Sequence, residues 1–143
     1  MSKDEKVLHL ALRTLITASH ICHHYGVLDA YGHISVRNPN NPSTFFLSKD
    51  LPPALISSSD DLFEYYIEDA KPVDPNAPKG YSERLIHSEI MKKFAHVNSV
   101  VHSHAEDVLP FAISDVPLKS TIHMAGFLGT TPRSVPINPT ELC

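Results

Sequence analysis

The chain has 143 residues, a length that suits one domain of ordinary size. It is 42% hydrophobic and 20% charged, which supplies a core and excludes a disordered chain. Its net charge of −4 argues against a general nucleic-acid binder, and two cysteines exclude a disulfide scaffold. It has no apolar run of the roughly 18 to 20 residues that a membrane span needs and no signal-peptide core. We therefore expect a cytoplasmic protein without nucleic-acid or membrane partners.

Hydrophobic spacing predicts a mixed fold in which short strands alternate with helices. Apolar residues at helical intervals predict a first helix over 4–24, with Gly26 just past its end. Proline-rich loops separate the next elements. The predicted strands cover 32–37, 44–47, 62–67, 98–104 and 118–124. The sequence therefore predicts the α/β class, a sheet flanked by helices.

A second helix is predicted over 82–94, and a shorter one over 106–113. Ser82 is a natural N-cap, and Glu83 lies in the first turn, where negative charge is favoured. His87 is assigned to the exposed side of this helix. The buried stripe is predicted to consist of Leu85, Ile86, Ile90 and Phe94.

His102 and His104 form a His-x-His pair at the end of a predicted strand. Side chains two residues apart in a strand lie on the same face, so both imidazoles can reach one cation. Zinc and similar divalent metals bind histidine nitrogen readily. The chain holds 10 histidines, so two exposed loop histidines are the alternative interpretation.

Glu83 begins the helix that leads into this strand. An antiparallel return brings the start of the helix near the end of the strand, beside His102 and His104. A carboxylate there can act as a metal ligand or as a general base. The alternative is a first-turn glutamate that only offsets the helix dipole.

Three motifs follow one another along the chain: 32–37 (Gly-His-Ile-Ser-Val-Arg), 82–87 (Ser-Glu-Arg-Leu-Ile-His) and 100–104 (Val-Val-His-Ser-His). Together they resemble the class II aldolase/adducin N-terminal domain family. The spacing also matches, since Glu83 precedes the two histidines by 19 and 21 positions, as the acidic residue of the family does. Segment 121–129 resembles the family as well, particularly its fungal and decarboxylase-like branches.

The resemblance implies a three-layer α/β/α fold around a mostly antiparallel sheet. It implies divalent-metal-dependent carbon–carbon bond cleavage or a related decarboxylation of a small hydroxy-carbonyl or sugar-like substrate. His102 and His104 would hold the metal, most simply zinc, and Glu83 would transfer protons. Family members are commonly tetramers, so the resemblance also implies a homo-oligomer.

Substrate-binding residues follow from the same resemblance. His33 stands where the sugar-phosphate aldolases carry Asn, which puts a phosphorylated sugar in doubt. Ser57 and Ser58 lie where the family places hydroxyl residues that hold phosphate, and their N–H groups suit an anion. A simple polar turn is the alternative for these serines.

The chain departs from the family in its C-terminal part. The third metal-binding histidine of the family would fall near position 165, and His123 is the candidate replacement. We expect a shortened family domain over 1–129 and an irregular, proline-rich tail over 130–143. A non-catalytic, adducin-like interaction module and an inactive truncated form remain the alternatives to an enzyme.

Overall fold

The computed structural model describes residues 1–78, 80–120 and 122–128. The chain divides into a first compact unit, Met1–His104, and a second unit that begins at Ala105. The second unit contains α3 (Leu109–Ile113) and the 3-10 helix η3 (His123–Leu128). The predicted boundary at 129 and the predicted tail lie outside the described residues. The first unit contains α1 (Lys3–His24), β1 (His33–Arg37), β2 (Thr44–Ser48), β3 (Leu62–Tyr66), α2 (Arg84–Lys93) and β4 (Ser99–His102).

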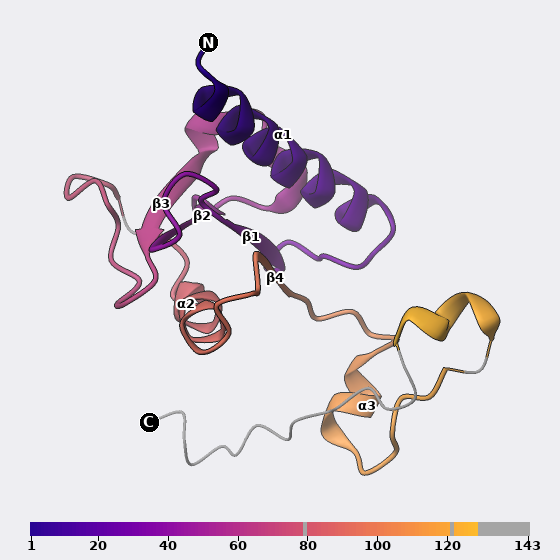
Figure 1. Cartoon of the computed structure of the whole chain (residues 1–143). Coiled ribbons are helices and arrows are strands. Elements are labelled where there is room, and N and C mark those ends of the chain that lie inside the picture. Colours follow the sequence, from indigo (N-terminus) through magenta and orange to yellow (C-terminus); the bar gives the residue numbers. More distant parts are fainter. Residues whose placement is uncertain (79, 121, 129–143) are drawn as a thin grey trace. The chain divides into compact units, whose positions relative to one another are not determined.

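The four strands form one antiparallel sheet in the order β3-β2-β1-β4. In Figure 1, α1 lies along one face of this sheet and α2 on the other. The predicted α/β class with an antiparallel sheet is confirmed. Two 3-10 turns, η1 (Pro53–Leu55) and η2 (Ser59–Asp61), connect β2 to β3.

Helix α1 is fixed at both ends by its own sequence. The Ser2 hydroxyl accepts the Glu5 N–H, and the Glu5 carboxylate accepts the Ser2 N–H, which completes a capping box. Gly26 follows the helix with φ +71°, a conformation that glycine adopts without strain. The predicted first helix is therefore confirmed nearly to the residue.

Strand alternation separates the core into two clusters, one on each face of the sheet. In β2, Phe45 and Leu47 belong to the cluster on the α2 face, whereas Phe46 belongs to the one beneath α1. The α2-face cluster comprises Phe45, Leu47, Tyr65, Ile67, Tyr81, Met91 and Val100. The α1-face cluster comprises Leu15, Leu28, Ile34, Phe46, Ile56 and Leu62.

The second predicted helix exists, but its predicted buried stripe is wrong at three of four positions: only Ile90 is partly buried and packs against the core. Leu85, Ile86 and Phe94 are all exposed, at 52%, 39% and 43%. The buried residues are His87, Ser88 and Met91. His87 is buried against polar side chains of β1. The buried face of α2 therefore carries polar groups, which a search for apolar residues does not detect.

Of two further predicted elements, a short helix is confirmed and a strand is wrong. The short helix predicted over 106–113 is confirmed as α3, with a proline in its first turn. The strand predicted over 118–124 is wrong, because 118–120 carry no regular structure and η3 begins at His123. No helix in the described ranges has both the length and the apolar character that crossing a bilayer demands.

Candidate metal and proton-transfer site

Glu83 occupies the N-cap position of α2 rather than its first turn, and it makes no side-chain cap bond. Ser82, the predicted N-cap, precedes it. The Glu83 carboxylate can therefore contact side chains of β1 and β4. It still lies at the N-terminal, positive end of the α2 dipole. Arg84 fixes this end of α2, because its guanidinium donates hydrogen bonds to the carbonyls of Ala70 and Tyr81.

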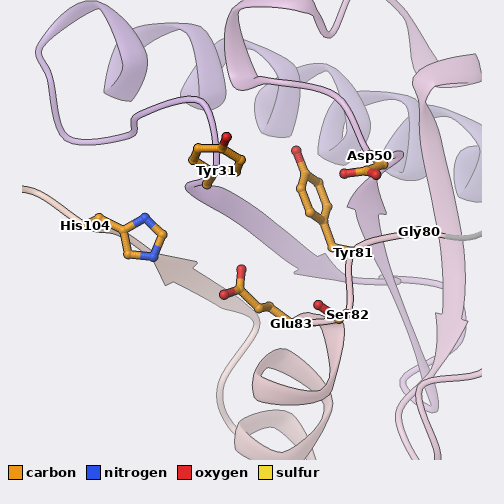
Figure 2. Close-up of a pocket in the computed structure, with 7 residues that line it drawn as sticks. All are labelled: Tyr31, Asp50, Gly80, Tyr81, Ser82, Glu83 and His104. Carbon is orange, nitrogen blue, oxygen red and sulfur yellow. The ribbon is translucent and has the colours of Figure 1, made fainter.

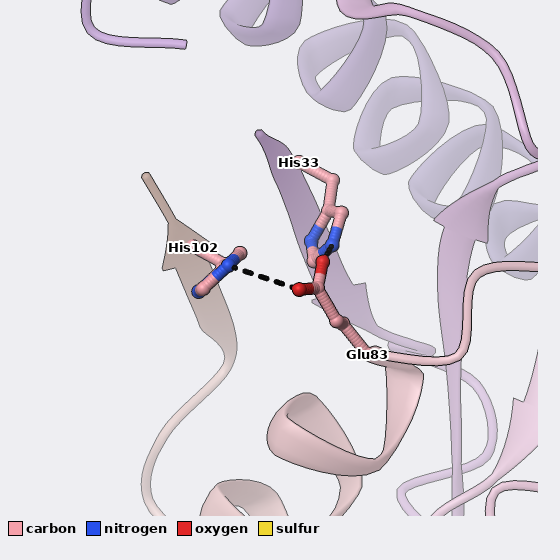
Figure 3. A group of neighbouring side chains, drawn as sticks. All are labelled: His33, Glu83 and His102. Atoms are coloured by element: carbon pink, nitrogen blue, oxygen red, sulfur yellow. Dashed lines mark hydrogen bonds and ion pairs between the residues drawn. The ribbon is translucent and has the colours of Figure 1, made fainter. Parts of the chain in front are cut away.

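His33 and His102 are cross-strand partners in the β1–β4 register. Their rings stack with centroids 5.1 Å apart, on the sheet face that α2 covers. His33 Nε2 lies 3.1 Å from Glu83 Oε2, and His102 Nε2 lies 3.7 Å from Glu83 Oε1. In Figure 3 the three side chains converge from β1, β4 and the start of α2.

His104 follows β4 and turns back toward His102. The two Nε2 atoms lie 3.0 Å apart, and two nitrogens on one tetrahedral zinc ion would be about 3.3 Å apart. The prediction that His102 and His104 can reach one cation therefore agrees with their positions. The Ser103 hydroxyl between them donates a hydrogen bond to the Val27 carbonyl, which attaches this segment to the loop before β1.

Asp29 supplies a partner for His104 that sequence reasoning missed. Its carboxylate oxygens lie 3.2 and 3.3 Å from His104 Nδ1. Burial raises the pKa of Asp29, but hydrogen bonds from the Tyr31 and Gly32 N–H groups and from His104 outweigh burial and leave it below its usual value. An ionised carboxylate only accepts, so His104 donates through Nδ1, and in its neutral form Nε2 is then the bare nitrogen that can bind a metal.

Gly32 permits the close approach of the two strands that carry these histidines. A Cβ at this position would lie 2.8 Å from the Leu28 side chain and 3.2 Å from the His102 carbonyl oxygen. A side chain at this position would therefore require Leu28 to move and the His102 carbonyl to shift by a few tenths of an ångström.

A pocket of about 380 Å³ opens beside the carboxylate of Glu83 (Figure 2). Tyr81 forms one wall, and its hydroxyl donates a hydrogen bond to the Leu51 carbonyl at 2.5 Å. The residues that line the pocket are Tyr31, Asp50, Gly80, Tyr81, Ser82, Glu83 and His104. Small-molecule sites are concave in this way and carry a few convergent polar groups.

His87 lies behind His33 and is fully buried, so its predicted exposed position is wrong. Its Nε2 lies 2.7 Å from His33 Nδ1, and its Nδ1 lies 2.6 Å from the Ser35 hydroxyl. Burial lowers the pKa of His87 to about 3, and nearby histidine charge adds to the effect. Burial also lowers the pKa of His33, against the opposing hydrogen bond to Glu83.

Ser57 and Ser58 are not among the residues that line this pocket. Both of their N–H groups and the Ser57 hydroxyl donate to one carboxylate oxygen of Asp61. Within the described structure, the Asp61 carboxylate therefore binds the donor groups that were expected to bind an anionic ligand. Their role in substrate binding stays a prediction, as does that of His123, which lies in the second unit.

Several residues of the site carried no local signal in the sequence. Asp29 meets His104 across 75 residues of sequence, and Ser35 meets His87 across 52. Such pairs depend on strand register, which periodicity does not provide. The pocket residues Tyr31, Asp50 and Tyr81 were also missed, because they lie in segments between the helices and strands and only the fold brings them together.

Comparison with known proteins agrees with this geometry. The model of one protein family, the class II aldolase and adducin N-terminal domain, matches residues 13–142. The chain belongs to this family. The resemblance proposed from the three motifs is confirmed.

A curated relative is decarboxylase tropJ of Talaromyces stipitatus. It is 57% identical over 122 residues, which cover 85% of this chain and 46% of the relative. The chain therefore spans about half the length of this curated relative.

Solved structures show the same fold. L-fuculose 1-phosphate aldolase from Glaciozyma antarctica aligns with a TM-score of 0.68 at 22% identity, over 92% of this chain and 57% of that one. An aldolase II superfamily protein from Pseudomonas syringae aligns with a TM-score of 0.67 at 23% identity, over 80% of this chain and 45% of that one.

The donor set fits the divalent metal that the family generally uses. One ligand atom each from His33, Glu83 and His102 lies within 4.8 Å of the others. Imidazole nitrogen with carboxylate oxygen is a common ligand set for zinc and related ions. His104 adds a further nitrogen, Nε2, which lies 3.0 Å from His102 Nε2.

Proposed function

We propose that this chain is the metal-binding part of a lyase that cleaves a carbon–carbon bond in a small hydroxy-carbonyl or sugar-like substrate. The observation that carries the proposal is the convergence of Glu83, His102 and His104, of which Glu83 and His104 line a pocket. Membership of the class II aldolase family and a decarboxylase relative support the reaction class.

His102 and His104 would hold the metal, and zinc is the ion that best suits their imidazoles. Such an ion polarises a carbonyl or hydroxyl oxygen and stabilises the negative charge that develops when the bond breaks. Asp29 holds His104 in the tautomer that presents Nε2. The pocket that borders Glu83 and His104 would receive the substrate, and Tyr81 would line it.

Glu83 would move the proton. In aldol cleavage, its carboxylate accepts the hydroxyl proton while the neighbouring carbon–carbon bond breaks and leaves its electron pair on the departing carbon. In decarboxylation, Glu83 would first take up a proton from solvent; the bond to the substrate carboxylate then breaks, carbon dioxide leaves, and Glu83 delivers that proton to the carbon that retains the electron pair. Both reactions use the same group in the same place.

We also propose that the protein acts on a small-molecule substrate, lies in the cytoplasm and forms a homo-oligomer. The family resemblance supports the homo-oligomer. Size-exclusion chromatography with light scattering measures the oligomeric state directly, and a monomer at working concentration would remove that part of the proposal.

The experiment is a reaction-class screen on the purified full chain supplied with zinc. One arm offers hydroxy-aldehydes and hydroxy-ketones and detects released aldehyde. The other arm offers keto and hydroxy carboxylates and detects released carbon dioxide. Turnover in either arm that Glu83→Gln abolishes supports the proposal. No turnover by folded, zinc-loaded chain would favour the non-catalytic interaction module.

A further inference from the structure

A continuous line of hydrogen-bonding groups runs from the sheet interior to the Glu83 carboxylate. It begins at the Ser35 hydroxyl, 2.6 Å from His87 Nδ1. It continues from His87 Nε2 to His33 Nδ1 at 2.7 Å, and from His33 Nε2 to Glu83 Oε2 at 3.1 Å. Neither imidazole has another hydrogen-bond partner among the contacts of the described residues.

The carboxylate fixes the direction of every bond in this line. An ionised carboxylate only accepts, so His33 must carry its proton on Nε2. A neutral His33 then has a bare Nδ1, so His87 must donate to it from Nε2. His87 Nδ1 is bare in turn, and the Ser35 hydroxyl must donate to it. Only one set of tautomers satisfies all three bonds.

Both imidazoles are shielded from solvent, and the assignment describes their neutral forms. His33 is 1% exposed and His87 is 0% exposed. Unsatisfied polar atoms would be costly in such a place, so the set of bonds resists rearrangement. Two aromatic rings pack against the imidazoles. The Phe45 ring stacks on that of His87 with centroids 6.5 Å apart, and the Tyr81 ring lies 4.8 Å from that of His33.

We propose that Ser35, His87 and His33 are positioning residues for Glu83. They hold Oε2 through the His33 N–H and thereby direct Oε1 toward His102 and the pocket. The two oxygens of one carboxylate then have different tasks: Oε2 is held and Oε1 is free for proton transfer. This inference rests on the proposed role of Glu83.

The competing arrangement makes His33 a metal ligand. Its Nε2 is one of three ligand atoms that lie close enough to share an ion. That arrangement requires a bare Nε2 on His33 and a proton on Nδ1, which is the opposite tautomer. The two interpretations therefore differ in the location of one proton.

The first test is nitrogen-15 NMR of the histidine rings in the full chain, before and after zinc is added. We expect protonated Nε2 and bare Nδ1 in both His33 and His87, unchanged by zinc. A proton on His33 Nδ1 in either state would overturn the proposal. Because this measurement needs no turnover, it stands even if the proposed lyase activity fails.

The second test compares His87→Gln with His87→Met, which have nearly the same shape. The Gln amide can donate to His33 Nδ1 and accept from Ser35, whereas Met can do neither. We expect the nitrogen-15 signals of His33 to report protonated Nε2 and bare Nδ1 in His87→Gln, as in the wild type, and a mixture of both tautomers in His87→Met. A purely structural role predicts the same His33 signals in the two variants, and that result would overturn the proposal.

Ser35→Ala tests the far end of the line against Ser19→Ala. Both serines are buried, and Ser19 donates its hydroxyl to the Leu15 carbonyl on α1, away from the site. We expect Ser35→Ala to let His87 populate the Nδ1-protonated tautomer, whereas Ser19→Ala leaves its ring signals unchanged. Identical His87 signals in both variants would contradict the role of Ser35. A chain that binds no zinc would refute the proposed function, and the tautomers would still decide this inference.

Discussion

Asp29 and His104 are separated by 75 residues of sequence, yet the Asp29 carboxylate lies 3.2 Å from His104 Nδ1. The backbone N–H groups of Tyr31 and Gly32 donate to Oδ1 of the same carboxylate. The loop before β1 thus determines which nitrogen of His104 remains bare at the end of β4. A histidine whose second nitrogen is held by a carboxylate is a common feature of metal centres.

Asp29→Asn should weaken zinc binding about 10- to 100-fold, the usual effect of losing an outer-shell partner. The Asn oxygen can still accept from Tyr31 and Gly32, so the turn should persist while the negative charge is lost. Isothermal titration with zinc measures the change. The matched control is Asp74→Asn, because Asp74 accepts the Asn76 N–H in a similar turn elsewhere. Equal affinity in the two variants would argue against the Asp29–His104 contact.

Glu83→Gln should lower the turnover rate about 10²- to 10⁴-fold, the range that one general acid–base group contributes. The amide keeps the size of the side chain but cannot take up and return a proton. Initial rates at saturating zinc measure the effect. Glu89→Gln, on the same helix and exposed, should leave the rate unchanged. A Glu83→Gln variant that keeps more than half of the wild-type rate would assign the proton transfer to another group.

Buried His87 should make the first unit less stable in acid. Its folded pKa of about 3 lies below the unfolded value of about 6.5, so between these values the unfolded chain binds a proton that the folded chain does not. The free energy of unfolding is therefore fully retained above pH 6.5 and falls as pH decreases toward 3, by up to ~1.4 kcal/mol per pH unit from this residue.

Urea unfolding of the wild type and of His87→Met at several pH values between 7 and 4 isolates this contribution. The wild type should lose stability faster than the variant, which has no group to titrate at this position. Parallel pH dependence in the two proteins would mean that His87 is not held neutral.

Two buried tyrosine hydroxyls should differ in their contribution to stability. Tyr81 donates to the Leu51 carbonyl, whereas the Tyr65 hydroxyl has no hydrogen-bond partner in the described part of the chain. Tyr81→Phe should therefore lower the free energy of unfolding by about 1 kcal/mol. Tyr65→Phe should cost less than about 0.5 kcal/mol, since it removes an unsatisfied buried group. Thermal unfolding of both variants measures the difference, and equal losses would indicate a hidden partner for Tyr65.

The sequence was sufficient for elements whose signals are local. Apolar spacing over 4–24 with Gly26 just past its end identifies α1, and alternation in 32–37 identifies β1. The phase of α2 could not be obtained in this way, because its buried side chains include His87 and Ser88, which periodicity counts as exposed. Their burial depends on polar partners that only the fold supplies.

The order and spacing of the sequence motifs predicted one part of the site. Glu83, His102 and His104 were found from their order and separation, and the structure brings them together. Asp29, Ser35 and His87 were not, because each acts through a partner more than 50 residues away. Strand register and the packing of α2 create these contacts, and neither can be read from one segment of sequence.

The most direct measurement is the metal content of the purified chain by mass spectrometry, beside a His102→Ala/His104→Ala double variant. His9→Ala/His96→Ala is the matched control, because it removes two exposed histidines outside the site. We expect about one divalent ion per chain in the wild type and in the control, and none in the His102/His104 variant. A folded wild-type chain that holds no metal after incubation with zinc, or a His102/His104 variant that retains its metal, would contradict the proposed site.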